Sequence, residues 1–186
     1  MTLVLKMLFA LSSIGTVWGA YKLGQKMYSD LGGVLVAAAI ALAPYRALNL
    51  FVRGAVSEAW AILFLPWILF GLTSLVDAAM QGEKWRAIRK HWFLFLLALS
   101  GMFLSHNLTT LMFLPITVFF AGLYWVLRFF PFQKRTQIEK KEFWQKTARL
   151  LFYGTTAFLL ALCLSAFYLL PAFLEKAIEE LECELV

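Results

Sequence analysis

Six long apolar stretches constrain this chain more than any other feature of its sequence. A helix rises 1.5 Å per residue, so roughly 20 apolar residues cross the hydrocarbon core of a bilayer. Charged residues, Pro or Gly bound each stretch. The sequence therefore predicts an all-α, polytopic membrane bundle of about six transmembrane helices, which forms one domain over residues 1–186. The predicted spans are Thr2–Leu23, Leu31–Leu50, Ala55–Ala79, His91–Leu104, Thr109–Phe130 and Leu150–Leu170.

The composition excludes the other large classes of protein. Hydrophobic residues make up 62% of the chain and charged residues only 15%, which is more apolar surface than one small soluble core can bury. Two cysteines, Cys163 within a span and Cys183 near the end, do not form a disulfide framework. The net charge of +6 comes from basic segments between spans, where membrane topology explains it. We therefore expect a membrane-lipid partner and no nucleic acid.

The basic segments predict the orientation in the membrane. Positively charged loops stay in the cytoplasm, and two loops separated by two spans must share one side. The two segments between the third and fourth spans and between the fifth and sixth spans meet this condition, which places the N-terminus outside. Their basic residues are Lys84, Arg86, Arg89, Lys90, Lys134, Arg135, Lys140, Lys141, Lys146 and Arg149. The unusual polar residues then gather at the outer face, namely Arg46, Arg53, Glu58, His106, Asn107, Glu175 and Lys176.

A polar stripe at the end of the second span is the first candidate site. Arg46, Asn49, Arg53 and Ser57 are spaced by three or four residues and would share one face of a continuous helix. Arginine presents a planar fork that pairs with phosphate oxygens while its stem stays in apolar surroundings. Two interpretations stay open. The stripe binds a phosphate or pyrophosphate, or both arginines extend to lipid headgroups at a helix end.

Glu58 and the segment around His106 supply the other candidates. On a continuous helix Glu58 would lie about 140° from Arg53 and face a different neighbour. It would act as a general base or as the partner in a structural ion pair, and its position one turn inside a span favours the ion pair. The stretch His91–Leu104 spans only about 21 Å, which predicts a Ser105–Asn107 turn recessed below the membrane surface. His106 and Asn107 then line a watered cavity, or Ser105 and Asn107 only cap helices.

Several other chemistries have no support in the sequence. His91 and His106 lie at opposite ends of one predicted span, about 20 Å apart, so they cannot share a metal. The chain has no phosphate-binding glycine loop, and no cofactor is evident, although a divalent metal in the complete protein stays an open alternative. Asp77 and the basic segment from Lys134 to Arg149 are interpreted as membrane-boundary features.

Three strings of the sequence resemble one family of membrane proteins: APYRALNLFVRGAVSEAW, LSHNLTTLMFLP and SAFYLLPAFLEK. The chain is similar to bacterial multi-pass proteins described as 6-pyruvoyl-tetrahydropterin synthase-related, which resemble the GT-C superfamily of glycosyltransferases. The resemblance implies transfer of a sugar from a polyprenyl-phosphate carrier at the outer face of the bacterial inner membrane. It also implies that Arg46 and Arg53 hold the donor phosphate, and that His106 and Asn107 line the pocket. It carries no pterin chemistry, which needs a zinc held by three histidines.

The resemblance also suggests that the sequence is part of a longer protein. The superfamily places its catalytic acid in a long outer loop that would precede residue 1, and family members continue past the PAFLEK string. We therefore expect a fragment that lacks its general base when alone. Two other functions remain open: a transporter or flippase for a lipid-linked or anionic solute, and a non-catalytic assembly subunit. The small residues Gly32, Gly33, Ala37 and Ala41 would give such a subunit a packing surface.

Overall fold

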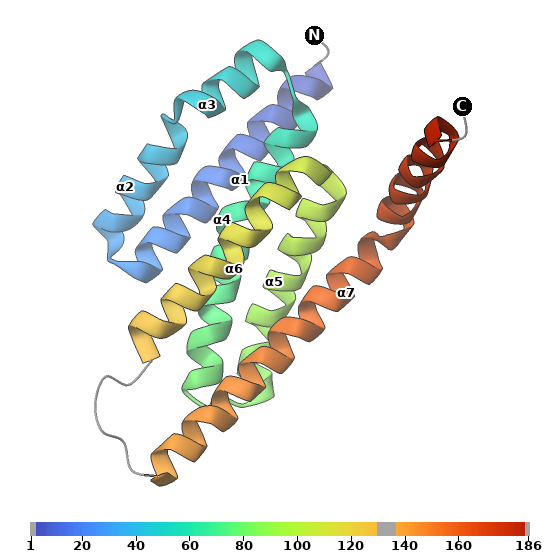
Figure 1. Ribbon diagram of the computed structural model, residues 1–186. Helices are drawn as coiled ribbons and strands as arrows, with labels where there is room; N and C mark the ends of the chain where they lie inside the picture. Colours follow the sequence, from blue (N-terminus) through green and yellow to red (C-terminus); the bar gives the residue numbers. More distant parts are fainter. Residues whose placement is uncertain (1–2, 130–136, 185–186) are drawn as a thin grey trace.

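The computed structural model describes the backbone of residues 3–129 and 137–184 and the side chains of residues 3–129 and 141–171. Every regular element in these residues is helical (Figure 1). The elements are α1 (Leu3–Met27), α2 (Asp30–Ala41), α3 (Pro44–Ala47), the π-helix η1 (Leu48–Arg53), α4 (Val56–Met80), α5 (Trp85–Ser105), α6 (Asn107–Phe129) and α7 (Gln137–Glu184). Thr2, Phe130, Lys134, Arg135 and the side chains of Lys140, Glu175, Lys176 and Cys183 lie outside the described part.

The helices confirm the predicted class of fold. Five of them are long and apolar enough to cross a membrane: α1, α4, α5, α6 and the part of α7 from Lys141 to Pro171. One further pair of helical segments is long and apolar enough to cross a membrane only when both are taken together, with a bend of 48° between them: Asp30–Ala41 and Pro44–Arg53. The chain is therefore an all-α membrane bundle with five spans, or six when the bent pair counts as one.

The second predicted span is not one continuous helix, which corrects the sequence-based prediction. Helix α2 ends at Ala41, and Ala43 adopts an extended ψ of 124° immediately before Pro44. Proline disfavours helical geometry in the residue before it, but its fixed φ suits the first position of a new helix. Pro44 therefore ends one helix and starts the next.

The fourth predicted span is longer than expected. Helix α5 begins at Trp85 and has 21 residues, so its first turns carry Arg86, Arg89 and Lys90. Long basic side chains can reach the headgroup region from within a helix, which is why a run of apolar letters underestimates its length. The prediction of a short fourth span, based on His91–Leu104, is therefore wrong.

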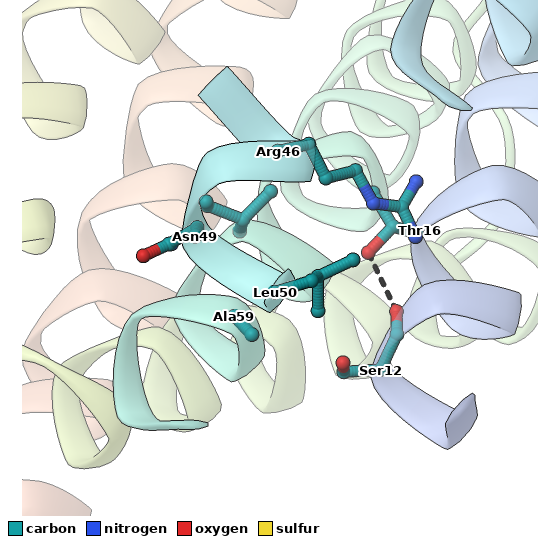
Figure 2. Close-up of a pocket in the computed structure, with 7 residues that line it drawn as sticks. Ser12, Thr16, Arg46, Asn49, Leu50 and Ala59 are labelled. Atoms are coloured by element: carbon teal, nitrogen blue, oxygen red, sulfur yellow. Dashed lines mark hydrogen bonds between the residues drawn. The ribbon is translucent and has the colours of Figure 1, made fainter. Parts of the chain in front are cut away.

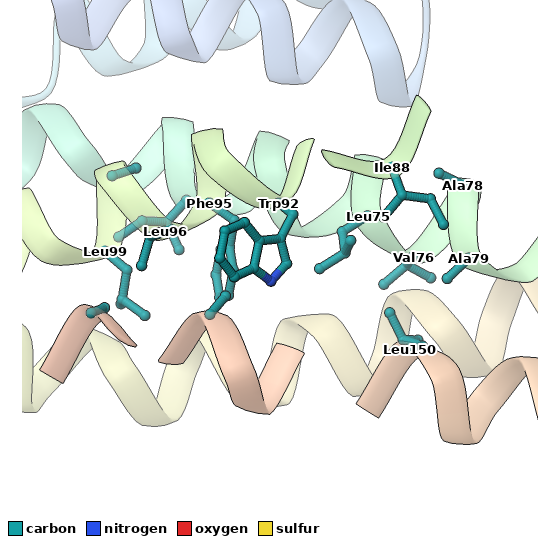
Figure 3. Packing of buried hydrophobic residues seen from close by; sticks show 14 of the residues in the cluster. Leu75, Val76, Ala78, Ala79, Ile88, Trp92, Phe95, Leu96, Leu99 and Leu150 are labelled. Carbon is teal, nitrogen blue, oxygen red and sulfur yellow. The ribbon is translucent and has the colours of Figure 1, made fainter. Parts of the chain in front are cut away.

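Helix α4 lies at the centre of the bundle and packs against α1, α5, α6 and α7, while α2 packs on α1 (Figure 1). Two close approaches of α1 to α4 need glycine. A Cβ atom on Gly15 would lie 2.7 Å from Leu63 Cδ1, and one on Gly19 would lie 2.8 Å from Trp67 Nε1. On the other side of α4, apolar side chains of α4, α5 and α7 form the main core (Figure 3).

The candidate functional residues lie at one end of the bundle. The start of α1, the α3–η1 segment and the α5–α6 turn lie at one end, which we call the Arg46 end (Figure 1). The α1–α2 turn, the α4–α5 turn and the start of α7 lie at the other, which we call the basic end. The described basic residues of both inter-span segments therefore share an end, as predicted. Which side of the membrane each end faces stays a prediction.

Candidate functional site

The predicted polar stripe divides into two parts because its helix changes type. Arg46 and Asn49 are turned into the protein, with exposed fractions of 9% and 1%, whereas Arg53 and Ser57 are exposed. The π-helical segment alters the spacing of side chains around the axis, and Gly54, at a φ of +62°, ends it before α4 begins. The prediction of a single stripe is therefore wrong for Arg53 and Ser57, while Arg46 and Asn49 are both buried.

Arg46 and Asn49 line a small cavity between α1, η1 and α4 (Figure 2). The Arg46 side chain extends toward Thr16 of α1, while the amide of Asn49 points to the other side (Figure 2). The cavity offers a volume of about 10 Å³ to the centre of a water molecule, which is room for roughly one water. Its other lining residues are Ser12, Thr16, Leu50, Ala59 and Ile62.

The polar groups of this cavity are not satisfied by the protein. The buried Nη1 of Arg46 and both amide atoms of Asn49 have no hydrogen-bond partner in the part of the chain that the structure describes. The hydroxyls of Ser12 and Thr16 donate to carbonyls of their own helix, at 2.9 and 2.6 Å. A buried polar atom without a partner costs about 1–3 kcal/mol, and a charged one more. The cavity therefore favours a polar or anionic guest.

Glu58 is the buried acid of the Arg46 end, and it is held by two neighbours. Its Oε2 lies 3.2 Å from Nη1 of Arg53, and its Oε1 accepts a hydrogen bond from the Tyr45 hydroxyl. The chain reverses at Gly54, so Glu58 faces Arg53 instead of lying 140° away from it, which corrects that expectation. The ion-pair interpretation of Glu58 is confirmed. Both carboxylate oxygens therefore have a partner in this conformation.

His106 forms the turn between α5 and α6. Its Nδ1 accepts a hydrogen bond from the backbone N–H of Thr109 at 3.1 Å, so the imidazole caps the start of α6. Thr110 Oγ1 donates to the carbonyls of Met102 and His106, at 2.9 Å each. Asn107 is exposed. Neither His106 nor Asn107 lines the Arg46 cavity, and their role in substrate binding stays a prediction.

An ionic cluster that was not predicted from the sequence lies at the basic end. Asp77 of α4 lies 3.0 Å from Lys26 Nζ of α1 and 3.1 Å from Arg128 Nε of α6. The Tyr124 hydroxyl donates to the same carboxylate at 3.0 Å, and Lys26 also donates to Ser74 at 2.7 Å. Asp77 is therefore the centre of a network and not only a boundary residue. The opposite charges of Lys26 and Asp77 at the same predicted end of two spans were the available signal.

The structure offers no metal centre among the described residues, where no group of three His, Cys, Asp or Glu side chains comes together. His91 and His106 lie 15 positions apart on and just after α5, toward its opposite ends. Comparisons with protein-family models, with curated proteins and with solved structures found no match for this chain. Its function is therefore argued from the site.

Proposed function

We propose that the Arg46 end binds the phosphate of a polyprenyl-phosphate-linked sugar. In this proposal the chain is the membrane part of a glycosyltransferase that acts at the outer face of the bacterial inner membrane. The observation that carries the proposal is that Arg46 lines a cavity and that its buried Nη1 has no hydrogen-bond partner among the described residues.

The position of Arg46 supports a lipid-borne ligand over a soluble one. It lies after the break between α2 and α3, near one end of a bundle of apolar helices, and the phosphate of a lipid carrier would also lie near the end of a span. Its guanidinium could bind two phosphate oxygens at once. The neighbouring side chains Leu50, Ala59 and Ile62 are apolar and suit the first isoprene units.

Sugar transfer itself needs an acid or base, and the described chain offers Glu58 and His106 for that role. Glu58 is a buried carboxylate that pairs with Arg53, and the next residue, Ala59, lines the Arg46 cavity. His106 caps α6 and does not line that cavity. Glu58 is therefore the better candidate for proton transfer once Arg53 and Tyr45 release it.

One observation favours a transporter as the second candidate. The interrupted helix beside a polar cavity resembles the broken helices that form binding sites in secondary transporters. Against it, the close approach of Gly19 to Trp67 lies between the two polar clusters of the α1–α4 interface.

The proposal is tested by binding. The full chain in lipid nanodiscs is titrated with a long-chain polyprenyl phosphate, and with the corresponding polyprenol as the ligand without phosphate. Arg46→Lys keeps the charge but loses the fork, so we expect its affinity for the phosphate to fall at least about tenfold. Arg149→Lys, at an exposed position of α7, is the matched control and should bind as the original protein does. Equal binding of phosphate and polyprenol, or unchanged binding by Arg46→Lys, would contradict the proposal.

A further inference from the structure

The cavity at Arg46 is too small for the ligand that its polar groups favour. It holds roughly one water molecule, whereas a phosphate group carries four oxygens around its phosphorus. A phosphate can reach the buried Nη1 of Arg46 only if one wall of the cavity moves. The walls are α1, α4 and the α3–η1 segment.

Of the three walls, the α3–η1 segment has a non-helical junction at each end. At one end it joins α2 through Leu42 and the extended Ala43 before Pro44, where the helix axis bends by 48°. At the other end Gly54 has a φ of +62°, and a Cβ atom there would meet nothing within 4 Å. Two non-helical junctions thus flank ten residues, and such element ends are where hinge motions concentrate.

The two faces of this segment differ in character. Its inner face carries Arg46 and Asn49, which are buried. Its outer face carries Phe51 and Val52, which are 86% and 75% exposed. In contrast, α1 and α4 are fixed against each other by the glycine contacts of Gly15 and Gly19.

One polar contact ties the segment to α4 across the Gly54 junction. Tyr45 and Arg53, which lie at opposite ends of the segment, both reach the Glu58 carboxylate near the start of α4. Arg53 Nη1 also donates to the Tyr45 hydroxyl at 3.5 Å. The three side chains therefore close a ring that holds both ends of the segment to one buried acid.

We infer that the α3–η1 segment is a flap over the Arg46 cavity, and that the contacts of Tyr45 and Arg53 with Glu58 form the latch that keeps it closed. Opening the latch admits an anionic headgroup to Arg46, frees Arg53 to contact the same anion and leaves the Glu58 carboxylate without its partners. The flap rests on the proposed function only for the identity of the ligand, because its movement occurs without ligand.

The movement is measured by the accessibility of the cavity to a thiol reagent. In a Cys163→Ser, Cys183→Ser background, Asn49→Cys places the thiol in the buried wall, and Ser57→Cys provides an exposed reference nearby. Each is labelled with an anionic methanethiosulfonate, with the latch intact and with Glu58→Gln. We expect the ratio of the Asn49→Cys rate to the Ser57→Cys rate to rise at least about tenfold when the latch is broken. The reference removes the direct effect of the lost charge on the reagent.

Three further variants keep the test decisive. Arg53→Gln breaks the latch from its exposed side, and it is used if Glu58→Gln does not reach the membrane. The charge reversal Arg53→Glu with Glu58→Arg restores an ion pair and should return the ratio toward its original value. Glu142→Gln, which removes the ion pair with Lys146 at the basic end, should leave the ratio unchanged.

A ratio of labelling rates that is the same with the latch intact and broken would overturn the flap. Protection of Asn49→Cys by polyprenyl phosphate tests the ligand and not the flap, so the two proposals can fail separately.

Discussion

The ammonium group of Lys26 lies 3.0 Å from Asp77 Oδ2, which joins the end of α1 to the end of α4. The other oxygen of Asp77 meets Arg128 of α6, so a single carboxylate connects three helices. Only 11% of the most apolar window of α6 is buried, so this ionic contact adds to the apolar side chains that attach α6 to the core. Charges near the end of a span are retained where they are paired.

Removing the Asp77 charge should loosen the bundle. Asp77→Asn keeps a side chain of the same size but leaves Lys26 and Arg128 without their counter-ion, and we expect a loss of about 1–3 kcal/mol of stability. The measurement is thermal unfolding of the detergent-solubilised protein. Glu142→Gln, which breaks an exposed ion pair with Lys146 within one helix, should leave the unfolding midpoint unchanged. Equal midpoints for Asp77→Asn and the original protein would show that the network does not hold the helices.

The close approach of α1 and α4 gives a second prediction. Gly19→Ala would place a Cβ 2.8 Å from Trp67 Nε1, which donates a hydrogen bond to the carbonyl of Gly15 at 3.0 Å. The indole must move, and the change should destabilise the protein by about 1–3 kcal/mol. Gly122→Ala and Gly154→Ala are matched controls, because a Cβ at either position meets nothing within 4 Å. Both controls should be neutral or slightly stabilising in thermal unfolding, since alanine favours helix by about 1 kcal/mol.

Much of the fold could be predicted from the sequence because membrane spans are set by local properties. The apolar length that crosses a bilayer and the basic loops between spans depend on neighbouring residues alone. The predicted span Ala55–Ala79 therefore begins and ends within one residue of α4. It failed at Pro44, where a span contains its own break, and at Trp85, where basic side chains belong to the helix.

The candidate site was harder to predict because its geometry depends on helix type and on contacts between helices. The periodicity of Arg46, Asn49 and Arg53 assumed a regular α-helix, and no residue pattern announced the π-helical segment from Leu48. The pairing of Asp77 with Lys26 and Arg128 joins positions about 50 residues apart in the sequence. Such contacts follow from helix packing, which the apolar pattern alone does not specify.

The orientation in the membrane gives a third prediction. In the background without Cys163 and Cys183, single cysteines are placed at Ser57, at the Arg46 end, and at Gln81, in the α4–α5 turn at the basic end; both positions are exposed. Because basic segments stay in the cytoplasm, an impermeant thiol reagent added to intact cells should label Ser57→Cys and not Gln81→Cys. Gln81→Cys should react after the membrane is made permeable. The reverse pattern would place the Arg46 cavity in the cytoplasm.

The last prediction separates the two roles open to His106. Its Nδ1 accepts the N–H of Thr109, and the loss of such a helix cap costs about 1 kcal/mol. His106→Ala should therefore lower the unfolding midpoint, while His106→Asn, whose side chain can accept the same bond, should restore it. The second measurement is binding of a polyprenyl-phosphate-linked sugar to both variants in nanodiscs. If His106 also contacts the ligand, His106→Asn will bind more weakly despite its restored stability. If His106→Asn matches the original protein in both measurements, the imidazole only caps α6, and the site rests on Arg46, Asn49 and Glu58.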